Sequence, residues 1–287
     1  MNVSIDFGGS TIDAARWSND GKLLSVQTFE RFPHLNYQDL QSFFDASALA
    51  LDGARKVSVT GGRSSTFVTS HQGIPVVHVP EIEAIGRGGW YLFQNDERFK
   101  NLSFTGSLLV VSMGTGTCMV LVKVKDGEYF SSRHVGGTGV GGGTFLGLSK
   151  LLLGENDPAK LIPMFQKGSS SAVDLSVFDI VGGGIGVVPA DATASNLGKL
   201  ARDTGYTKED LAAGIANLIG QTIGITSTFA AMAHGAKKVL LTGKLTAMEE
   251  IVRFVQRTGE LYGVSMVAPV KSAFVSAVGA GCQFPPG

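Results

Sequence analysis

The sequence predicts an α/β protein of two lobes, in which mixed β-sheets are flanked by helices and a cleft lies between the lobes. Three observations support this fold class. The 287 residues are enough for two modest lobes, and hydrophobic residues make up 44% of them, which is sufficient for a sizeable core. In addition, the pattern strand, small-residue turn, strand, Asp-Gly hairpin occurs twice, about a hundred residues apart.

The first copy of this pattern opens the chain. Apolar runs predict strands at residues 3–6, 12–17 and 23–29, with a glycine turn after the first strand and a hairpin turn at residues 19–22. Apolar spacing predicts a helix within residues 37–51, and strands at 56–60 and 76–79 precede a helix that extends to about Phe93. Residues 95–105 are polar, so we expect an N-terminal lobe over residues 1–105 and a C-terminal lobe over 106–287.

The second copy opens the C-terminal half. Strands are expected at residues 108–112 and 118–124, with a small-residue turn between them and a hairpin turn at 125–128. The remainder is mostly helical, and two further strands are expected at 238–241 and 265–267. The predicted helices cover residues 144–153, 159–165, 196–203, 207–234, 248–258 and 273–281.

Composition excludes several classes of partner. The formal net charge is zero, and neither a basic stripe nor a polybasic helix is present, so we expect no nucleic acid and no membrane surface as partner. No apolar run is long enough to span a bilayer, and no signal-peptide pattern opens the chain. Cys118 and Cys282 lie far apart in apolar runs, which is typical of reduced core thiols and predicts a cytoplasmic protein.

The chain contains 39 glycines, and many of them gather in clusters just after predicted strands. Glycine permits positive φ and lets backbone N–H groups approach a ligand closely. Several such turns predict that loops from different strands converge on a phosphate-bearing ligand, with the two hairpins facing each other across the cleft. The clusters are Gly8-Gly9, Gly61-Gly62, Gly86 to Gly89, Gly114 with Gly116, Gly136 to Gly143, Gly182 to Gly186, Gly243, and Gly279 to Gly281.

Two of these turns offer hydroxyl and N–H donors suited to the phosphates of a nucleotide, although an ordinary hairpin would read the same way. They are Gly8, Gly9, Ser10 and Thr11 in the first half, and Gly114, Thr115, Gly116 and Thr117 in the second. Asp6 ends the first strand and is a candidate Mg²⁺ ligand through water, with an Asx-type turn as the alternative.

A third glycine block, at residues 136–143, can wrap phosphate or substrate, and we expect Gly141, Gly142 and Gly143 to contact phosphate. Thr144 would then be the N-cap of the following helix, whose positive dipole end faces the site. The alternative is a glycine-rich flap without contacts. Gly243 follows a strand and suits the adenosine side of a nucleotide site, with a plain strand-to-helix turn as its alternative.

Two carboxylates, Glu81 and Glu83, follow the strand at 76–79 and compete for a catalytic role. Phosphoryl transfer to an alcohol needs a group that orients the hydroxyl and accepts its proton, and a carboxylate does both. If Glu81 ends the strand, Glu83 would enter the turn and cap the helix. The sequence contains neither a Walker A motif nor a Cys-x-x-Cys pair, so a P-loop kinase and a zinc site are not supported.

Three segments resemble the signatures of the superfamily that includes actin, sugar kinases and heat-shock ATPases. Residues 6–10 resemble its phosphate-1 motif, 112–117 its phosphate-2 motif, and 241–243 its adenosine motif. The resemblance implies two actin-like (ribonuclease H-like) lobes that bind ATP and Mg²⁺ between them.

Five further segments narrow the resemblance to type II pantothenate kinases: residues 60–62, 80–84, 141–148, 191–198 and 273–280. This resemblance implies phosphorylation of pantothenate to 4'-phosphopantothenate, the first step of coenzyme A biosynthesis. It aligns the catalytic glutamate of the family with Glu81. It also implies a homodimer through the long helix at 207–234, which is apolar on most faces and must be buried within its lobe or against a second chain.

Two positions depart from the family. Asp13 stands where many members carry a lysine, so that either Asp13 points away, or another cation serves, or activity is poor. His134 stands where the family has a substrate-binding arginine, and Arg133 precedes it, so that either a bulge restores Arg133 or the acyl substrate is recognised differently. The predicted substrate-binding residues are Arg133, His134, Gly136, Gly137 and Thr138.

These departures keep two alternatives open. One is a kinase of the same fold that acts on pantetheine or an amino sugar. The other is a nucleotide-binding regulator without catalysis.

Overall fold

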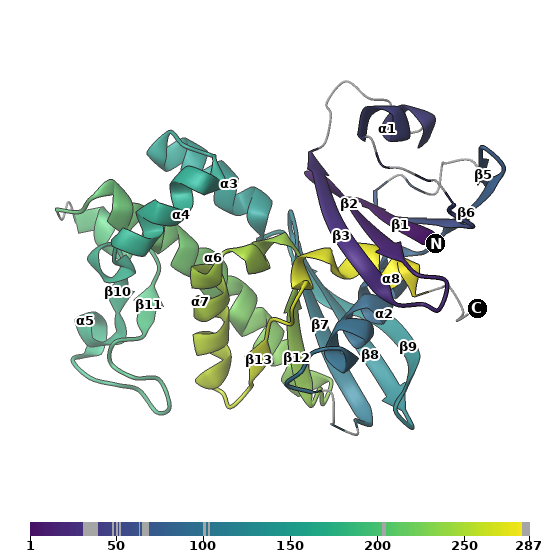
Figure 1. The fold of residues 1–287 in the computed structure, drawn as a ribbon. Coiled ribbons are helices and arrows are strands. Elements are labelled where there is room, and N and C mark those ends of the chain that lie inside the picture. The colour runs from purple at the N-terminus through teal and green to yellow at the C-terminus, as the bar shows by residue number, and fades with distance from the viewer. Residues whose placement is uncertain are drawn as a thin grey trace.

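Two β-sheets with their flanking helices make up the fold in the computed structural model, which describes residues 1–30, 40–47, 49, 51, 53–62, 64, 69–99, 102, 104–202 and 205–282. The first sheet lies beside the second, and a group of helices extends from the second sheet on the side away from the first (Figure 1). The predicted fold class of two mixed sheets flanked by helices is confirmed.

The first sheet has six strands in the order β3-β2-β1-β4-β6-β5, and β1 is antiparallel to β2 but parallel to β4. Alternate side chains of a strand lie on the same face of the sheet, and on the face that packs into the core these side chains are apolar. Helix α1 (Leu40–Ser47) covers one face, where Phe43 packs edge-on against Phe7. The strands are β1 (Asn2–Phe7), β2 (Thr11–Trp17), β3 (Leu23–Glu30), β4 (Val57–Thr60), β5 (Ser70–His71) and β6 (Ile74–His78).

The second sheet has five strands in the order β13-β12-β7-β8-β9. Its central strand β7 pairs in parallel with β12 and antiparallel with β8, so the sheet is mixed. The strands are β7 (Gly106–Met113), β8 (Thr117–Lys125), β9 (Glu128–Thr138), β12 (Lys238–Thr242) and β13 (Met266–Val267).

Helices cover both faces of this second sheet, which explains why residues 108–111 of β7 are entirely buried. Leu108 and Val110 face α2 (Glu81–Gln94), whereas Leu109 and Val111 face the core under α6 (Lys208–Ala233). Around α6 pack α3 (Gly142–Leu153), α4 (Pro158–Lys167) and α7 (Glu249–Glu260). The predicted span 207–234 agrees with α6, whose N-cap is Thr207 and whose C-cap is His234.

A smaller unit lies beyond these helices, at the end of the molecule farthest from the first sheet (Figure 1). It contains β10 (Leu175–Ser176), α5 (Val177–Val181) and β11 (Thr193–Ser195). The helix expected at 196–203 is only a 3-10 turn, Gly198–Arg202, and the left-handed φ of 59° at Leu197 prevents a helix from starting before it. Asp203, and part of the helix expected within 37–51, lie outside the described residues.

Two helices pack on the sheet from the other half of the chain. α2 follows the first sheet in sequence but packs on the second, while α8 (Val275–Gly281), near the end of the chain, packs on β1, β2 and β4. α2 and α8 also contact each other closely. The lobe boundary at residue 105 therefore stays a prediction. In the structure, α2 and α8 each pack on the sheet that the other half of the chain forms.

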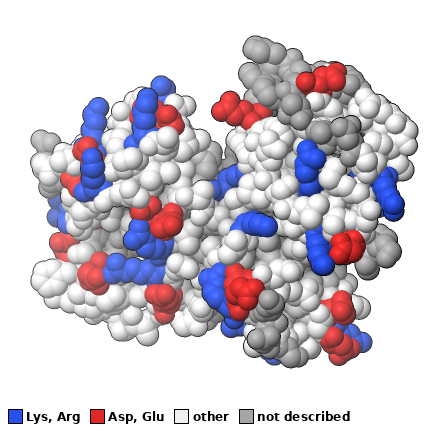
Figure 2. All heavy atoms as spheres, viewed as in Figure 1, with Lys and Arg blue, Asp and Glu red and all other residues white. Residues whose placement is uncertain are grey.

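Charges of both signs are interspersed over the face seen in Figure 2. Among the described residues, no helix combines the length and apolar character needed to cross a membrane. Both cysteines, Cys118 and Cys282, are free thiols, and burial raises their pKa to about 11 and about 12.

Candidate functional site

A cleft of about 770 Å³ lies where the two sheets meet. Loops at the ends of β1, β4, β7 and β12 line it, together with the first residues of α2 and α3. Residues predicted for nucleotide or metal binding gather on its wall, namely Asp6, Gly8, Gly9, Ser10, Thr11, Glu81, Gly114, Thr115, Gly116, Thr117, Gly142, Gly143 and Gly243. Segments more than 200 residues apart in sequence therefore meet at one site.

The turns at residues 8–11 and 114–117 face each other across this cleft, as the repeated pattern predicts. The hydroxyl oxygens of Ser10 and Thr115 lie 3.4 Å apart. A Cβ on Gly9 would lie 3.0 Å from the Thr115 hydroxyl, so the close approach of the two turns favours glycine there. The hydroxyl of Thr117 donates to the carbonyl of Val140 and is already engaged within the protein.

Asp6 is the last polar residue of β1, and three neighbours define its surroundings. It lies directly opposite Asp13 in the β1–β2 pair, and opposite cross-strand residues share a face. Its Oδ1 occupies the space that a side chain on Gly61 would fill, and Ser276 of α8 hydrogen-bonds to the carboxylate. Burial, followed by repulsion from Asp13 and Glu81, raises the pKa of Asp6 to about 7.

Glu81 is the first residue of α2, and its exposed side chain lines the cleft. Glu81 does not end the strand, because β6 ends at His78, Pro80 is the N-cap and the helix begins at Glu81. Glu83 does not cap the helix either. Glu83 accepts a hydrogen bond from Arg87 Nε at 2.9 Å, one turn along the same helix.

The triple glycine at 141–143 is bonded to the turn at 114–117, while its predicted contact with phosphate stays a prediction. The N–H groups of Gly142 and Gly143 donate to the carbonyls of Gly114 and Thr115, at 2.8 and 2.9 Å, so they are not free for phosphate. A Cβ on Gly141 would lie 2.7 Å from Gly116, so glycine is needed for this loop contact. Thus these glycines hold the turn at residues 114–117 in place.

Thr144 was expected as the N-cap of the following helix, but the N-cap is Gly141. Thr144 is the third helical residue, and its hydroxyl accepts a hydrogen bond from the Gly141 N–H. The helix therefore begins earlier than predicted, since the glycines themselves form its first turn.

Gly243 directly follows β12 and has a left-handed φ of 87°. A Cβ there would lie 2.6 Å from the Met113 carbonyl oxygen, at the end of β7. Both facts favour glycine at position 243, where the turn packs against the end of β7, just before the turn at residues 114–117.

Arg133 and His134 lie on the edge strand β9 and are exposed, and neither lines the cleft. His134 is opposite Val120, in the core layer beneath α2, whereas Arg133 is opposite Leu121, on the other face. The register shifts twice along this pair, between Lys123 and Val124 and between Met119 and Val120, but Arg133 lies between the two shifts and is opposite Leu121. A bulge therefore does not bring Arg133 to the face that carries Glu81.

Of the other three predicted substrate-binding residues, one reaches the cleft. Thr138 lines it, and its hydroxyl accepts a hydrogen bond from the Val140 N–H. Gly136 and Gly137 pair with Met119 and Cys118 of β8 and do not line the cleft.

Lys244 is a cleft residue that sequence reasoning missed. Its Nζ lies 2.6 Å from Asp13 Oδ1 and 2.8 Å from the Thr28 hydroxyl. Asp13 thus does not point away from the cleft but meets a cation from the second sheet. The signal in the sequence was a lysine directly after the glycine at 243, together with an unmatched aspartate at position 13.

Three of the glycine clusters lie outside the candidate site. Gly86 to Gly89 and Gly279 to Gly281 belong to α2 and α8, where they allow close helix packing. Gly182 to Gly186 lie in the distal unit after α5 and do not line the cleft. The glycine clusters at strand ends do mark loops that converge on the cleft. The clusters inside helices do not, because those glycines serve helix packing.

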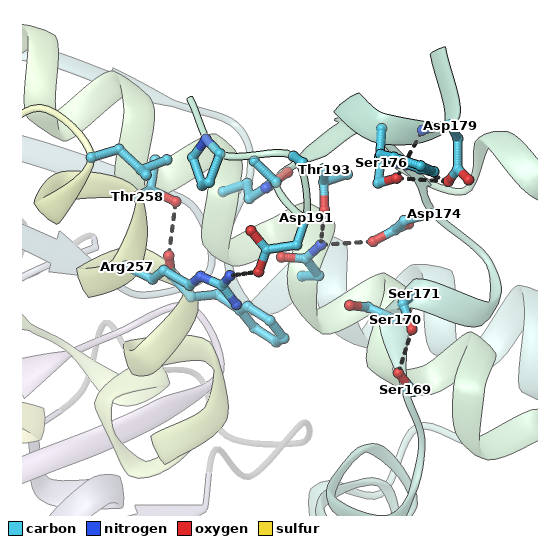
Figure 3. Close-up of a pocket in the computed structure, with 18 of the residues that line it drawn as sticks. Ser169, Ser170, Ser171, Asp174, Ser176, Asp179, Asp191, Thr193, Arg257 and Thr258 are labelled. Atoms are coloured by element: carbon cyan, nitrogen blue, oxygen red, sulfur yellow. Dashed lines mark hydrogen bonds and ion pairs between the residues drawn. The ribbon is translucent and has the colours of Figure 1, made fainter. Parts of the chain in front are cut away.

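A second cavity, of about 560 Å³, lies between α6, α7 and the distal unit (Figure 3). Its polar side chains already pair with one another. Asp174 accepts hydrogen bonds from the N–H of Leu197 and from Asn217, and Arg257 pairs with Asp191 at 2.6 Å. The first cleft, which unites the predicted residues, is therefore the candidate site.

A family profile and individual relatives place this chain in the same protein family. The Fumble family profile matches residues 10–256. A type II pantothenate kinase from Oceanobacillus iheyensis is 30% identical over 85% of this chain and 81% of its own length. Another, from Bacillus cereus strain ATCC 14579, is 29% identical over 77% of this chain and 75% of its own length.

Comparison with solved structures supports the fold. The activator of 2-hydroxyisocaproyl-CoA dehydratase from Clostridium difficile, with bound ADPNP, has a TM-score of 0.61 at 15% identity and covers 98% of this chain and 93% of its own. A ROK family glucokinase from Streptomyces griseus, in complex with glucose and AMPPNP, has a TM-score of 0.60 at 13% identity, with 98% coverage of both chains.

Proposed function

Because this chain belongs to the Fumble family, we propose that it is an ATP-dependent kinase that phosphorylates pantothenate to 4'-phosphopantothenate, the first step of coenzyme A biosynthesis. The observation that carries the proposal is the meeting, in one cleft, of two phosphate turns, the carboxylate of Asp6 and the exposed carboxylate of Glu81. We propose the cytoplasm as the compartment.

In this proposal the triphosphate of ATP lies between the turns at 8–11 and 114–117, and the adenosine lies on the side of Gly243. Each turn offers backbone or hydroxyl donors, which make strong charge-assisted hydrogen bonds to phosphate oxygens. Ser10 and Thr115 lie close enough to contact neighbouring phosphate oxygens from opposite sides.

The residues beside Asp6 fit Mg²⁺. A hard cation prefers oxygen ligands, and Mg²⁺ commonly uses only one or two carboxylates plus water and substrate phosphates. Asp6 supplies one such carboxylate, and the facing Asp13 adds negative charge. Among the described residues no cluster of three or more His, Cys, Asp or Glu side chains can form a complete metal cage, which suits a metal shared with the nucleotide. Bound Mg²⁺ would neutralise phosphate charge.

Glu81 orients the substrate hydroxyl and accepts its proton as the bond from that oxygen to the γ-phosphorus forms and the bond to ADP breaks. Its place as the first residue of α2 sets this carboxylate on the wall of the cleft. Glu83 is held in an ion pair with Arg87, and this leaves Glu81 as the carboxylate of α2 that lines the cleft.

The test is an ATP-consumption screen with pantothenate, pantetheine and hexosamines as acceptors, with Mg²⁺ concentration varied and products identified by mass spectrometry. We expect metal-dependent turnover that is fastest with pantothenate. Faster turnover with pantetheine or a hexosamine would assign another acceptor to the same site. ATP binding without phosphorylation of any acceptor would make the chain a nucleotide-binding regulator.

A further inference from the structure

Lys244 joins the two sheets at the candidate site. It is the first residue after Gly243, on the second sheet, yet its ammonium contacts β2 and β3 of the first sheet. Asp13 and Thr28 are themselves opposite each other in the β2–β3 pair, and the Thr28 hydroxyl donates to Asp13 Oδ1 at 2.8 Å. The three side chains form a closed triangle of contacts.

The environment of Lys244 leaves its ammonium able to reach a ligand. A lysine ammonium has three N–H donors, and Asp13 and Thr28 take two of them. The ring of Phe274 lies 4.5 Å from Nζ and fixes the side chain further. Still, 35% of the lysine side chain is exposed, compared with 7% for Asp13, and Lys244 lines the cleft. The carboxylate is thus enclosed while the cation faces the open space.

The charge of the cleft calls for a cation. Among the described residues that line it, three are carboxylates, Asp6, Asp13 and Glu81, and one, Lys244, is a cation. A nucleoside triphosphate adds several negative charges to this wall. A cation held in place by a buried carboxylate and a hydroxyl loses little side-chain entropy on binding phosphate, because it is already ordered.

We propose that Lys244 contacts the phosphates of the bound nucleotide and that Asp13 and Thr28 position it for this contact from the opposite sheet. The inference rests on the proposed function only in that the cleft binds a nucleotide, and it does not depend on the acceptor. It assigns Asp13 a positioning role. The competing explanation is an ion pair that merely holds the two sheets together.

Nucleotide binding to the Lys244→Met variant separates these explanations. We expect the affinity for ATP, measured by calorimetry, to fall about 10- to 100-fold, as for a lost hydrogen bond to a charged group. The affinity for adenosine, which has no phosphate, should stay within about threefold. Lys22→Met is the matched control, since Lys22 is 80% exposed on a hairpin turn and should change neither affinity.

A second variant guards against a folding artefact, because Lys244→Met leaves the buried Asp13 carboxylate unpaired. The double variant Lys244→Met/Asp13→Asn removes both charges. We expect it to be more stable than the single variant and to keep the full loss of ATP affinity. Recovery of parental ATP affinity in the double variant would overturn the inference, as would equal losses for ATP and adenosine in the single variant.

These outcomes are distinct from failure of the proposed function. If the parent chain binds ATP through Lys244 but does not phosphorylate pantothenate, the inference stands and the acceptor assignment fails. If the parent binds no ATP, the kinase proposal fails and the Lys244 assignment fails with it.

Discussion

The same residue type serves two purposes at the start of α2. Glu81 lines the cleft, and Glu83, two residues on, pairs with Arg87. Glu81→Gln keeps the shape and most hydrogen bonds but cannot accept a proton. We therefore expect turnover to fall about 100-fold or more, while ATP affinity stays within a few-fold because the phosphate turns are unchanged. Steady-state kinetics together with calorimetry of ATP binding check this.

Glu83→Gln is the matched control for that experiment. It removes an ion pair that is partly exposed, so we expect a loss of stability below about 1 kcal/mol and nearly full turnover. An inactive Glu83→Gln beside an active Glu81→Gln would mean that the catalytic register is displaced by two residues.

The buried carboxylate of Asp6 carries a stability cost in the free protein, which the proposed metal-binding role would explain. Its pKa is raised from 3.8 to about 7, so the folded state binds this proton more tightly than the unfolded chain does. The stability that the folded protein gains by binding this proton is therefore complete below about pH 4 and is lost as the pH rises through 7. Asp6→Asn avoids the buried charge, and we expect it to unfold at higher denaturant concentration at pH 8, with a gain of about 1–3 kcal/mol.

The same variant should weaken metal-dependent turnover. Stability gained with turnover lost would identify Asp6 as a residue whose charge is kept for binding. Two results would contradict this assignment: no stability difference between parent and variant at pH 8, or an unchanged response to Mg²⁺. Chemical denaturation at pH 4 and pH 8, with no nucleotide or metal added, tests the linkage.

The positions of some site residues could be predicted from the sequence, and those of others could not. Asp6, Glu81 and the two phosphate turns were predictable, because short motifs at strand ends determine their positions. The pair Asp13–Lys244 was not, since its members are 231 residues apart and meet only once both sheets have formed. Arg133 and His134 depended on a strand register that no local pattern determines.

At the scale of elements, some glycines allow two helices to pack closely, and the sequence alone did not distinguish them from glycines in loops. A Cβ on Gly88 of α2 would lie 1.9 Å from the Val275 carbonyl oxygen at the start of α8. A Cβ on Gly279 of α8 would lie 1.6 Å from the Ala84 carbonyl oxygen. This contact connects the helix that begins with Glu81 to the helix whose Ser276 binds Asp6. It therefore helps to position both carboxylates.

We expect Gly88→Ala to lower the free energy of unfolding by about 2–4 kcal/mol, because the clash is with backbone that cannot move aside cheaply. Gly147→Ala on α3 is the control. A Cβ at Gly147 meets nothing within 4 Å, so that variant should gain up to about 1 kcal/mol from helix propensity. Urea denaturation of both variants measures the difference. Equal stability of the two variants would show that the α2–α8 contact is not rigid.

Strands and long helices were predicted well, since period-2 and period-3.6 patterns are local. Helix α6 agrees with its predicted span because a Thr207–Asp210 capping box marks its start. The start of α3 was predicted too late, because its N-cap is Gly141, a residue with no side chain that could mark the cap. The pairing of α2 with the second sheet and of α8 with the first required tertiary structure.

At the scale of the whole molecule, the apolar character of α6 needs no second chain. Its buried residues pack against α3, α4 and α7 within the same chain, so the argument that a charge-poor helix predicts a dimer interface does not apply to most of its length. Near its C-terminal end, however, Phe229 and Met232 are more than half exposed.

Exposed apolar side chains gather instead on the distal unit, at residues 178–187, where five of them are 53–70% exposed: Phe178, Ile180, Val181, Ile185 and Val187. Such a group on one short segment is typical of an interface, since isolated exposed apolar residues are common but clusters are not. We therefore keep the predicted homodimer and expect this segment, rather than the middle of α6, to be buried in it.

Light scattering at micromolar concentration should give twice the chain mass of 30.0 kDa. The double variant Phe178→Ser/Val187→Asp should shift the mass to that of one chain, because burying an unpaired charge in an apolar interface is costly. Both positions are far more exposed than the core, at 60% and 70%, so the variant should keep the unfolding free energy of the parent chain. Leu24→Ser, on β3 and 57% exposed, is the control and should remain dimeric. A parent chain that is monomeric at this concentration would refute the dimer, and a dimeric double variant would move the interface elsewhere.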